Sequence, residues 1–263
     1  MKSQTIEVSG IRTRFLESGT GEPIVILHGW GPDIVLEESF GHLTEKLSKK
    51  FRVLLVALPG FDGSEFPPKG GWTTHQYGEW LGELLKVLKP SSPALYGHSF
   101  GCRVIVRFLV QNPDFTGKII LTGAAGIKWD PETGRQKFMF AINKHFPGFK
   151  KFFRKACPQV LRPLILGKLL GAHDWAYVPE KLEKTLQKTL AEPDFREELG
   201  TIKNQVLLIW GEDDSVTPLR SAQVFAKMLP HAQLQVLKEG RHGIHKTHDE
   251  EISKLVIRFL HEK

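Results

Sequence analysis

The sequence predicts an α/β protein with a mostly parallel sheet of eight strands and helices on both faces. Three observations carry this prediction. Short apolar runs rich in β-branched residues recur along the chain, as buried strands require. Amphipathic helical patterns lie between the later runs, where a crossover must join two parallel strands. With 263 residues, of which 41% are hydrophobic and 25% charged, the chain can bury a large core.

The strand-like runs form an edge pair and a parallel set. Residues 5–8 and 13–17 lie too close in sequence for a helical crossover, so we expect them to pair antiparallel at an edge of the sheet. The later runs are dominated by Val, Ile and Leu, which is typical of strands buried on both faces. They are residues 24–27, 53–57, 94–96, 118–122, 206–210 and 233–237.

Helical patterns separate these later runs. A recurring apolar face predicts helices over residues 72–88, 100–111, 221–228 and 250–261. Asn112 and Pro113 end the second of these, because proline cannot continue a helix.

One region interrupts the alternation of strands and helices. About eighty residues between Thr122 and Val206 contain no strand-like run. Helical patterns punctuated by prolines occur there instead, over residues 138–141, 149–153, 161–170 and 182–190. We therefore expect a core domain of residues 1–126 and 201–263, with a helical cap over residues 127–200 inserted after the sixth strand.

Composition excludes several classes of protein. No apolar run reaches the roughly 18 residues that a membrane-spanning helix needs, and the N-terminus lacks the apolar stretch of a signal peptide. Cys102 and Cys157 do not suggest a disulfide framework, so we expect a cytoplasmic protein. No glycine-rich phosphate loop and no zinc spacing of Cys and His is present, so we expect neither a cofactor nor a metal.

Positive charge is concentrated in one stretch. The chain has a net charge of +7, and residues 128–172 hold ten basic residues against two acidic ones. This stretch fits an anionic substrate, peripheral contact with an anionic membrane, or simply a solvated helix face. No nucleic-acid-binding motif accompanies it, so we expect no nucleic-acid partner. The oligomeric state does not follow from the sequence.

The most informative stretch is LYGHSFGCRV, which sets Ser99 between Gly97 and Gly101 in the pattern G-x-S-x-G. A strand-like run precedes it and a helix-compatible run follows it. At a tight strand-to-helix turn the backbone is strained, and the residues two positions away must be small. The hydroxyl then projects from the carboxyl end of the strand, beside the N–H groups of the helix N-terminus. This arrangement favours Ser99 as a nucleophile over an ordinary turn residue.

With further segments, this stretch resembles the α/β-hydrolase family, in its capped form with a serine nucleophile. The resemblance covers essentially the whole chain. It rests also on PIVILHGWGP, FRVLLVALPGFDGSE, LIWGEDDSVTP and EGRHGIHKTHDEEISKLVIRFL. In that family the nucleophile, the acid and the histidine follow one another in this order along the chain, and the sequence offers that order.

The resemblance implies that the acid is Asp214. The family pattern G-x-x-D-x-x-x-P places it there, between Gly211 and Pro218, with Asp213 as the alternative. Some members carry the acid after the sixth strand instead. The segment after Thr122 has no carboxylate before residue 130, which favours Asp214.

The resemblance also implies that the general base is His242. This histidine follows the last strand-like run and precedes the last helix, with His245 and His248 as nearby alternatives. The spacing H-x-x-H-x-x-H does not predict a metal site, because no carboxylate joins it and Gly243 disfavours a helix there.

An oxyanion site and a substrate pocket complete the expected centre. The backbone N–H of Phe100 should be one donor to a developing oxyanion, and that of Trp30 in HGWG the other. We expect Trp30, Phe138 and Phe146 to contact the substrate. The phenylalanines of the cap either form an acyl pocket or are the cap's own small core.

A serine nucleophile predicts acyl transfer through an acyl-enzyme intermediate. The first hypothesis is a serine carboxylesterase or related acyl hydrolase, acting on a small acyl substrate that is lipid-like or anionic. A C–C bond hydrolase, an aminopeptidase and a cofactor-free haloperoxidase are alternatives on the same fold. A non-catalytic ligand-binding protein on a hydrolase scaffold is the alternative from another class.

Overall fold

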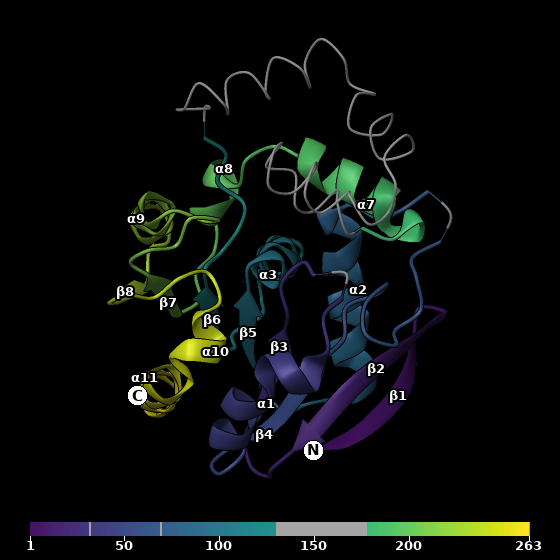
Figure 1. The fold of residues 1–263 in the computed structure, drawn as a ribbon, viewed down its shortest axis with the longest axis horizontal. Coiled ribbons are helices and arrows are strands. Elements are labelled where there is room, and N and C mark those ends of the chain that lie inside the picture. The colour runs from purple at the N-terminus through teal and green to yellow at the C-terminus, as the bar shows by residue number, and fades with distance from the viewer. Residues whose placement is uncertain (32, 69, 130–177, 263) are drawn as a thin grey trace, which may run out of the picture.

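The structure is a computed structural model that describes residues 1–31, 33–68, 70–129 and 178–262. Its sheet has the strand order β1-β2-β4-β3-β5-β6-β7-β8. Helices lie on both sides of this sheet (Figure 1). The predicted fold class is therefore confirmed.

The strands agree with the predicted runs to within a few residues at each end. Their bounds are Lys2–Val8 (β1), Ile11–Ser18 (β2), Pro23–Leu27 (β3), Arg52–Val56 (β4), Ala94–His98 (β5), Ile119–Thr122 (β6), Val206–Gly211 (β7) and Ala232–Leu237 (β8). The first two form the expected antiparallel edge pair, and β2 also pairs antiparallel with β4. The remaining pairs are parallel.

The predicted helices are also present where the structure describes the chain. They are Thr74–Leu88 (α2), Phe100–Gln111 (α3), Glu180–Ala191 (α7), Leu219–Met228 (α9) and Asp249–His261 (α11). Two short helices, Arg196–Leu199 (α8) and Ile244–Thr247 (α10), lack the length to give a periodic signal.

Helix α1, Leu36–Leu47, is a correction to the sequence reading, which predicted no helix between β3 and β4. Its buried side chains Leu36, Phe40, Leu43 and Leu47 recur at intervals of four, three and four residues. That spacing is a helical signal, and α1 buries this stripe against the sheet.

The central strands are buried on both faces, and β3 shows how. Val25 and Leu27 belong to the core cluster that contains α2, α3 and α9, whereas Ile24 and Ile26 belong to the cluster of α1 and α11. Successive side chains of a strand point to opposite faces, so each face packs its own layer of helices.

Parallel pairing brings the loops of the candidate site to one edge of the sheet. Leu27 at the end of β3 pairs with Gly97 on β5, and His98 pairs with Thr122 at the end of β6. The strands β3, β5 and β6 therefore end at the same edge of the sheet. The HGWG loop, the turn at Ser99 and the segment after β6 all start from this edge. Ligands of open α/β sheets bind at this carboxyl edge.

The division into a core domain and a cap of residues 127–200 stays a prediction, because the structure describes only residues 127–129 and 178–200 of the cap. Most of the basic stretch, with Phe138 and Phe146, lies outside the described residues. Membrane contact through this stretch therefore also stays a prediction. None of the helices in the described ranges has the length and apolarity that crossing a bilayer requires.

Candidate active site

Ser99 lies at the turn between β5 and α3 in a strained backbone conformation. Its φ of 49° and ψ of −108° place it in a region that non-glycine residues rarely adopt. A Cβ on Gly97 would lie 2.8 Å from the backbone N of Cys102, and one on Gly101 would lie 2.4 Å from the carbonyl oxygen of Leu27. Both glycines of the motif are thus required by the close approach of backbone around Ser99.

Among the residues that the structure describes, neither the backbone N–H of Phe100 at this turn nor that of Trp30 in the HGWG loop donates a hydrogen bond. Phe100 is the first residue of α3, so its N–H has no partner within the helix. The N–H of Trp30 has no hydrogen bond to any residue that the structure describes. The indole of Trp30 packs edge-on against the rings of Phe61 and Phe100, each with ring centroids 5.2 Å apart. This packing fixes the HGWG loop beside the start of α3.

Asp214 and His242 are brought together by the loops after β7 and β8. The Nδ1 atom of His242 lies 2.8 Å from Oδ2 of Asp214. The hydroxyl of Thr217 donates to the same oxygen at 2.8 Å, and the backbone N–H groups of Val216 and Thr217 donate to Oδ1 at 2.9 and 2.8 Å. The carboxylate therefore holds His242 with Nδ1 protonated, leaving its Nε2 free to accept a proton.

The surroundings of Asp214 keep it ionised. Burial opposes ionisation, but the hydrogen bonds and charge interaction with His242 and the bonds from Thr217 outweigh it and lower the pKa of the carboxyl. Gly123 leaves the space that this pair needs. A Cβ there would lie 3.2 Å from Nδ1 of His242 and 3.3 Å from Oδ2 of Asp214.

Ser99 and His242 line the same two cavities. One cavity, of about 450 Å³, lies between the core and α7, and its walls include Arg103, Leu186 and Val216. The other, of about 390 Å³, lies between the HGWG loop and the segment after His242. Within the described residues no hydrogen bond joins the Ser99 hydroxyl to the His242 ring. Such bonds are often long before a substrate is bound.

The predicted side chains thus divide into three groups. The structure brings Ser99, Trp30, Phe100, Asp214 and His242 to the walls of these cavities or to their immediate edge. Of the alternatives, His245 lines the smaller cavity, whereas Asp213 and His248 line neither. Asp214 does not line a cavity itself and is placed by its contact with His242. The pocket residues Phe138 and Phe146 lie outside the described residues.

Three further histidines of this region are held neutral: His98 and His245 beside His242, and His28 in the HGWG loop. Nε2 of His28 accepts the Leu58 N–H at 3.0 Å, so its Nδ1 carries the proton and donates to the carbonyl of Gly29. Burial lowers the pKa of His28 to about 4 and that of His245 to about 3. Burial and neighbouring histidines also hold the pKa of His98 well below its ordinary value. His28 is thereby a scaffold residue.

These buried histidines make the fold sensitive to acid. Their pKa values are lower in the folded chain than the ordinary 6.5, so the unfolded chain binds more protons below that pH. The free energy of unfolding should therefore fall as the pH decreases through 6.5. We expect His245→Phe, which can still stack on Phe40, to reduce this slope by up to about 1.4 kcal/mol per pH unit between pH 6 and 4.

Denaturant midpoints measured at several pH values check this expectation. The control is His231→Phe, which removes an exposed histidine just before β8. A slope in His245→Phe equal to that of the unmodified protein would contradict the assignment of His245 as buried and neutral.

Sequence reasoning missed several residues that shape the site. Thr217 is hydrogen-bonded to Asp214, and its position three residues after an aspartate is a typical turn signal. Gly123 gave no local signal, and His245 was predicted only as an alternative base, because the places of both residues depend on chain segments remote in sequence. Within the described ranges no group of three or more Cys, His, Asp and Glu side chains is arranged to hold a metal ion.

Comparison with known proteins gives a consistent result. A model of the alpha/beta hydrolase family matches residues 24–255. The 2-hydroxymuconate semialdehyde hydrolase of Pseudomonas sp. (strain CF600) is 23% identical over 98% of this chain and 93% of its own. Among solved structures, a serine hydrolase involved in carbazole degradation is 18% identical, with a TM-score of 0.76 over 98% of both chains. An esterase of Thermogutta terrifontis is 22% identical, with a TM-score of 0.70 over 99% of this chain and 98% of its own.

Proposed function

Because the chain belongs to the alpha/beta hydrolase family, we propose that it is a serine hydrolase that cleaves carboxylic esters through an acyl-enzyme intermediate. The observation that carries this proposal is Ser99 on a strained turn, lining the same cavities as an Asp214–His242 pair. A serine is a weak nucleophile on its own and needs an adjacent base to take its proton.

The proposed reaction begins with proton transfer from Ser99 to Nε2 of His242 as Oγ attacks the acyl carbon. The carbonyl oxygen gains negative charge, and the N–H groups of Trp30 and Phe100 would stabilise it. Collapse of this intermediate breaks the bond to the alcohol, which leaves with the proton from His242. A water molecule then attacks the acyl-enzyme in the same way and releases the acid. Asp214 stays ionised and stabilises the imidazolium in both steps.

The chemistry of the larger cavity supports an acyl group with an apolar part. Its walls near Ser99 are mainly apolar, from the segments after β6 and β7 and from α7. They include Ala124, Ile127, Trp129, Leu186, Leu190, Val216 and Pro218. Burial of each methylene of an acyl chain in such a cavity stabilises the complex by about 0.8 kcal/mol.

A second candidate is hydrolysis of a C–C bond next to a carbonyl. The favouring observation is the similarity, over nearly the full length of both chains, to a 2-hydroxymuconate semialdehyde hydrolase. The two candidates share the nucleophile and base, and they differ in the leaving group. A turnover comparison with 2-hydroxymuconate semialdehyde and p-nitrophenyl butyrate separates them, because the true substrate class should show the higher kcat/KM by at least tenfold.

Labelling with a fluorophosphonate tests whether Ser99 is activated at all. We expect one label for each chain on the Ser99 peptide, found by mass spectrometry, together with loss of ester turnover. The unlabelled enzyme should hydrolyse p-nitrophenyl esters of short to medium chain length. A chain that takes no label and hydrolyses no ester would instead favour a non-catalytic ligand-binding protein.

A further inference from the structure

Two arginines are buried side by side on the helix that begins at the proposed nucleophile. Arg103 and Arg107 lie one turn apart on α3, and each is only 9% exposed. Buried cations are costly unless they are paired and hydrogen-bonded, so their partners decide what they do.

The partners of both arginines come from the end of α7, the segment after it and the start of α2. Arg103 donates through Nη2 to the carbonyl of Thr189 at 2.7 Å and to Oε2 of Glu192 at 2.9 Å. Arg107 pairs with Glu198, and its Nε donates to the hydroxyl of Thr74 at 3.1 Å. Both guanidinium groups also lie over the ring of Phe195, at 5.3 and 4.4 Å from its centroid.

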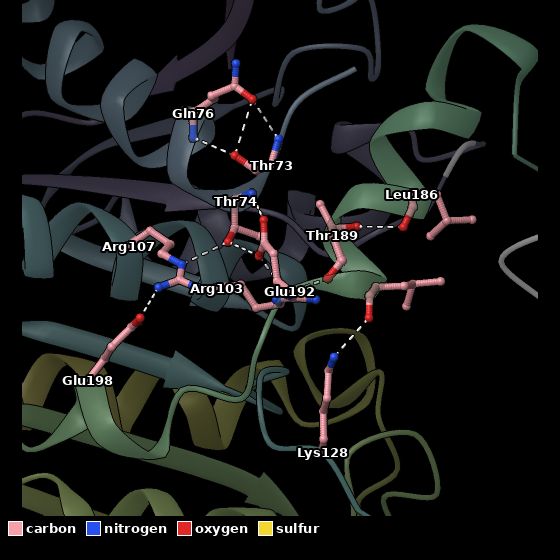
Figure 2. Close-up of polar contacts among 11 residues, drawn as sticks. Thr73, Thr74, Gln76, Arg103, Arg107, Lys128, Leu186, Thr189, Glu192 and Glu198 are labelled. Atoms are coloured by element: carbon pink, nitrogen blue, oxygen red, sulfur yellow. Dashed lines mark hydrogen bonds and ion pairs between the residues drawn. The ribbon is translucent and has the colours of Figure 1, made fainter. Parts of the chain in front are cut away.

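Glu192 joins three helices through one carboxylate. It caps the C-terminal end of α7 and receives Arg103 from α3. Its Oε1 accepts the backbone N–H of Thr74 at 2.6 Å, and its Oε2 accepts the Thr74 hydroxyl. Thr74 is the first residue of α2, where the helix dipole favours a negative charge. Figure 2 shows Glu192 between Thr74 and Arg103, with Thr189 beside it.

This contact network adjoins the larger cavity at the proposed nucleophile. Arg103, Leu186, Thr189 and Leu190 all line that cavity, together with Ser99. Arg107 does not line it, although it lies on the same helix and contacts the same Phe195. Of the two arginines, Arg103 is therefore the one that connects the start of α3 directly to the wall that α7 contributes.

We propose that Arg103 is a positioning residue: with Glu192 and Thr74 it clamps α7 against the start of α3, and thereby sets the size of acyl group that the cavity admits. This inference rests on the proposed function for its substrate. In the clamp the guanidinium is neutralised by Glu192, so Arg103 acts on selectivity by holding a wall and needs no charged substrate.

The test compares Arg103→Met, Glu192→Gln and the double variant, with Arg107→Met as the matched control. Methionine keeps an unbranched apolar stem and removes the charge and the hydrogen bonds. Turnover is measured on p-nitrophenyl butyrate and dodecanoate. We expect the dodecanoate-to-butyrate ratio of kcat/KM to rise about tenfold in both single variants, with the change carried by KM. The double variant should change it no more than either single one, because both remove the same contact.

The control separates positioning from simple loss of stability. Arg107→Met removes the ion pair of an equally buried arginine and a bond to the Thr74 hydroxyl, but it leaves the bonds of Glu192 to Arg103 and to the Thr74 N–H. It should therefore lower the melting temperature while changing the selectivity ratio less than threefold. An equal change of ratio in Arg107→Met, or no change in Arg103→Met and Glu192→Gln, would overturn the proposal. Glu192→Gln preserves side-chain shape and serves where Arg103→Met does not fold.

Two further measurements test direct binding of a substrate by Arg103 and the case in which the protein hydrolyses no ester. If Arg103 instead bound a substrate carboxylate directly, Arg103→Met would impair a p-nitrophenyl succinate monoester far more than the butyrate ester, and the clamp would be wrong. If the unmodified protein hydrolyses no ester, the proposed function fails, and hydrogen exchange still tests the clamp. Amides of α7 should then exchange at least tenfold faster in Arg103→Met and Glu192→Gln than in Arg107→Met, and equal rates would refute it.

Discussion

Ser99→Ala is expected to lower kcat/KM for an activated ester by about 10⁴-fold or more while the chain stays folded. The change removes the one atom that forms the acyl bond and keeps the Cβ, so the strained turn between Gly97 and Gly101 is unaltered. The expected loss is large because no neighbouring group can replace the hydroxyl. Cys102 is buried, and burial raises the pKa of its thiol, so it is not a reserve nucleophile.

Turnover of p-nitrophenyl butyrate and thermal unfolding, measured on the same preparation, check this prediction. Ser253→Ala on α11 is the control, since it removes a buried serine hydroxyl from the layer on the other side of the sheet. We expect an unchanged melting temperature for Ser99→Ala to within a few degrees. Retention of more than 1% of the turnover would mean that Ser99 does not form the acyl bond, and the proposed function would fall with it.

The fold could be predicted from the sequence because each strand of the sheet is encoded by a short local pattern. The runs of Val, Ile and Leu in β3 and β4 encode strands buried on both faces, and the structure packs a helical layer on each. Gly97 and Gly101 likewise predict a tight turn without knowledge of the segments that pack against it. Helix α1 has an equally local signal in its apolar spacing, so its absence from the prediction does not reflect a dependence on tertiary contacts.

The site was predictable only where the chemistry lies in a motif. Ser99 sits in a short pattern that can be read without the fold, whereas Asp214 and His242 were predicted from the family resemblance. Gly123 matters because β6 ends opposite the loops after β7 and β8, which is a tertiary fact. The same holds for Arg103, whose sequence position on α3 gives no hint of Glu192 some ninety residues later. Long-range contacts of this kind depend on how α7 and the segment after it pack against α2 and α3.

Asp214→Asn is expected to lower kcat by about 10³- to 10⁴-fold at neutral pH while the chain stays folded. Asparagine can keep its oxygen in the Oδ1 position, where it still accepts the N–H groups of Val216 and Thr217. Its amide then replaces Oδ2, so a donor faces Nδ1 of His242 where an acceptor stood. To accept from this amide, Nδ1 must present a lone pair, so the ring carries its proton on Nε2. In that tautomer Nε2 cannot take the proton of Ser99.

Asp213→Asn provides the matched control, because the two carboxylates are adjacent in sequence and only Asp214 contacts His242. We expect Asp213→Asn to keep kcat within about threefold of the unmodified protein. If Asp213→Asn lost more kcat than Asp214→Asn, the catalytic acid would be Asp213.

The free energy of unfolding should depend on pH in a characteristic way. Since the folded chain lowers the pKa of Asp214, its ionised form stabilises the fold above the ordinary carboxyl pKa, and this contribution is lost as the pH falls through the lowered value. Any difference in unfolding free energy between the unmodified protein and Asp214→Asn should therefore change only below about pH 4, whereas the loss of kcat should persist throughout the neutral range.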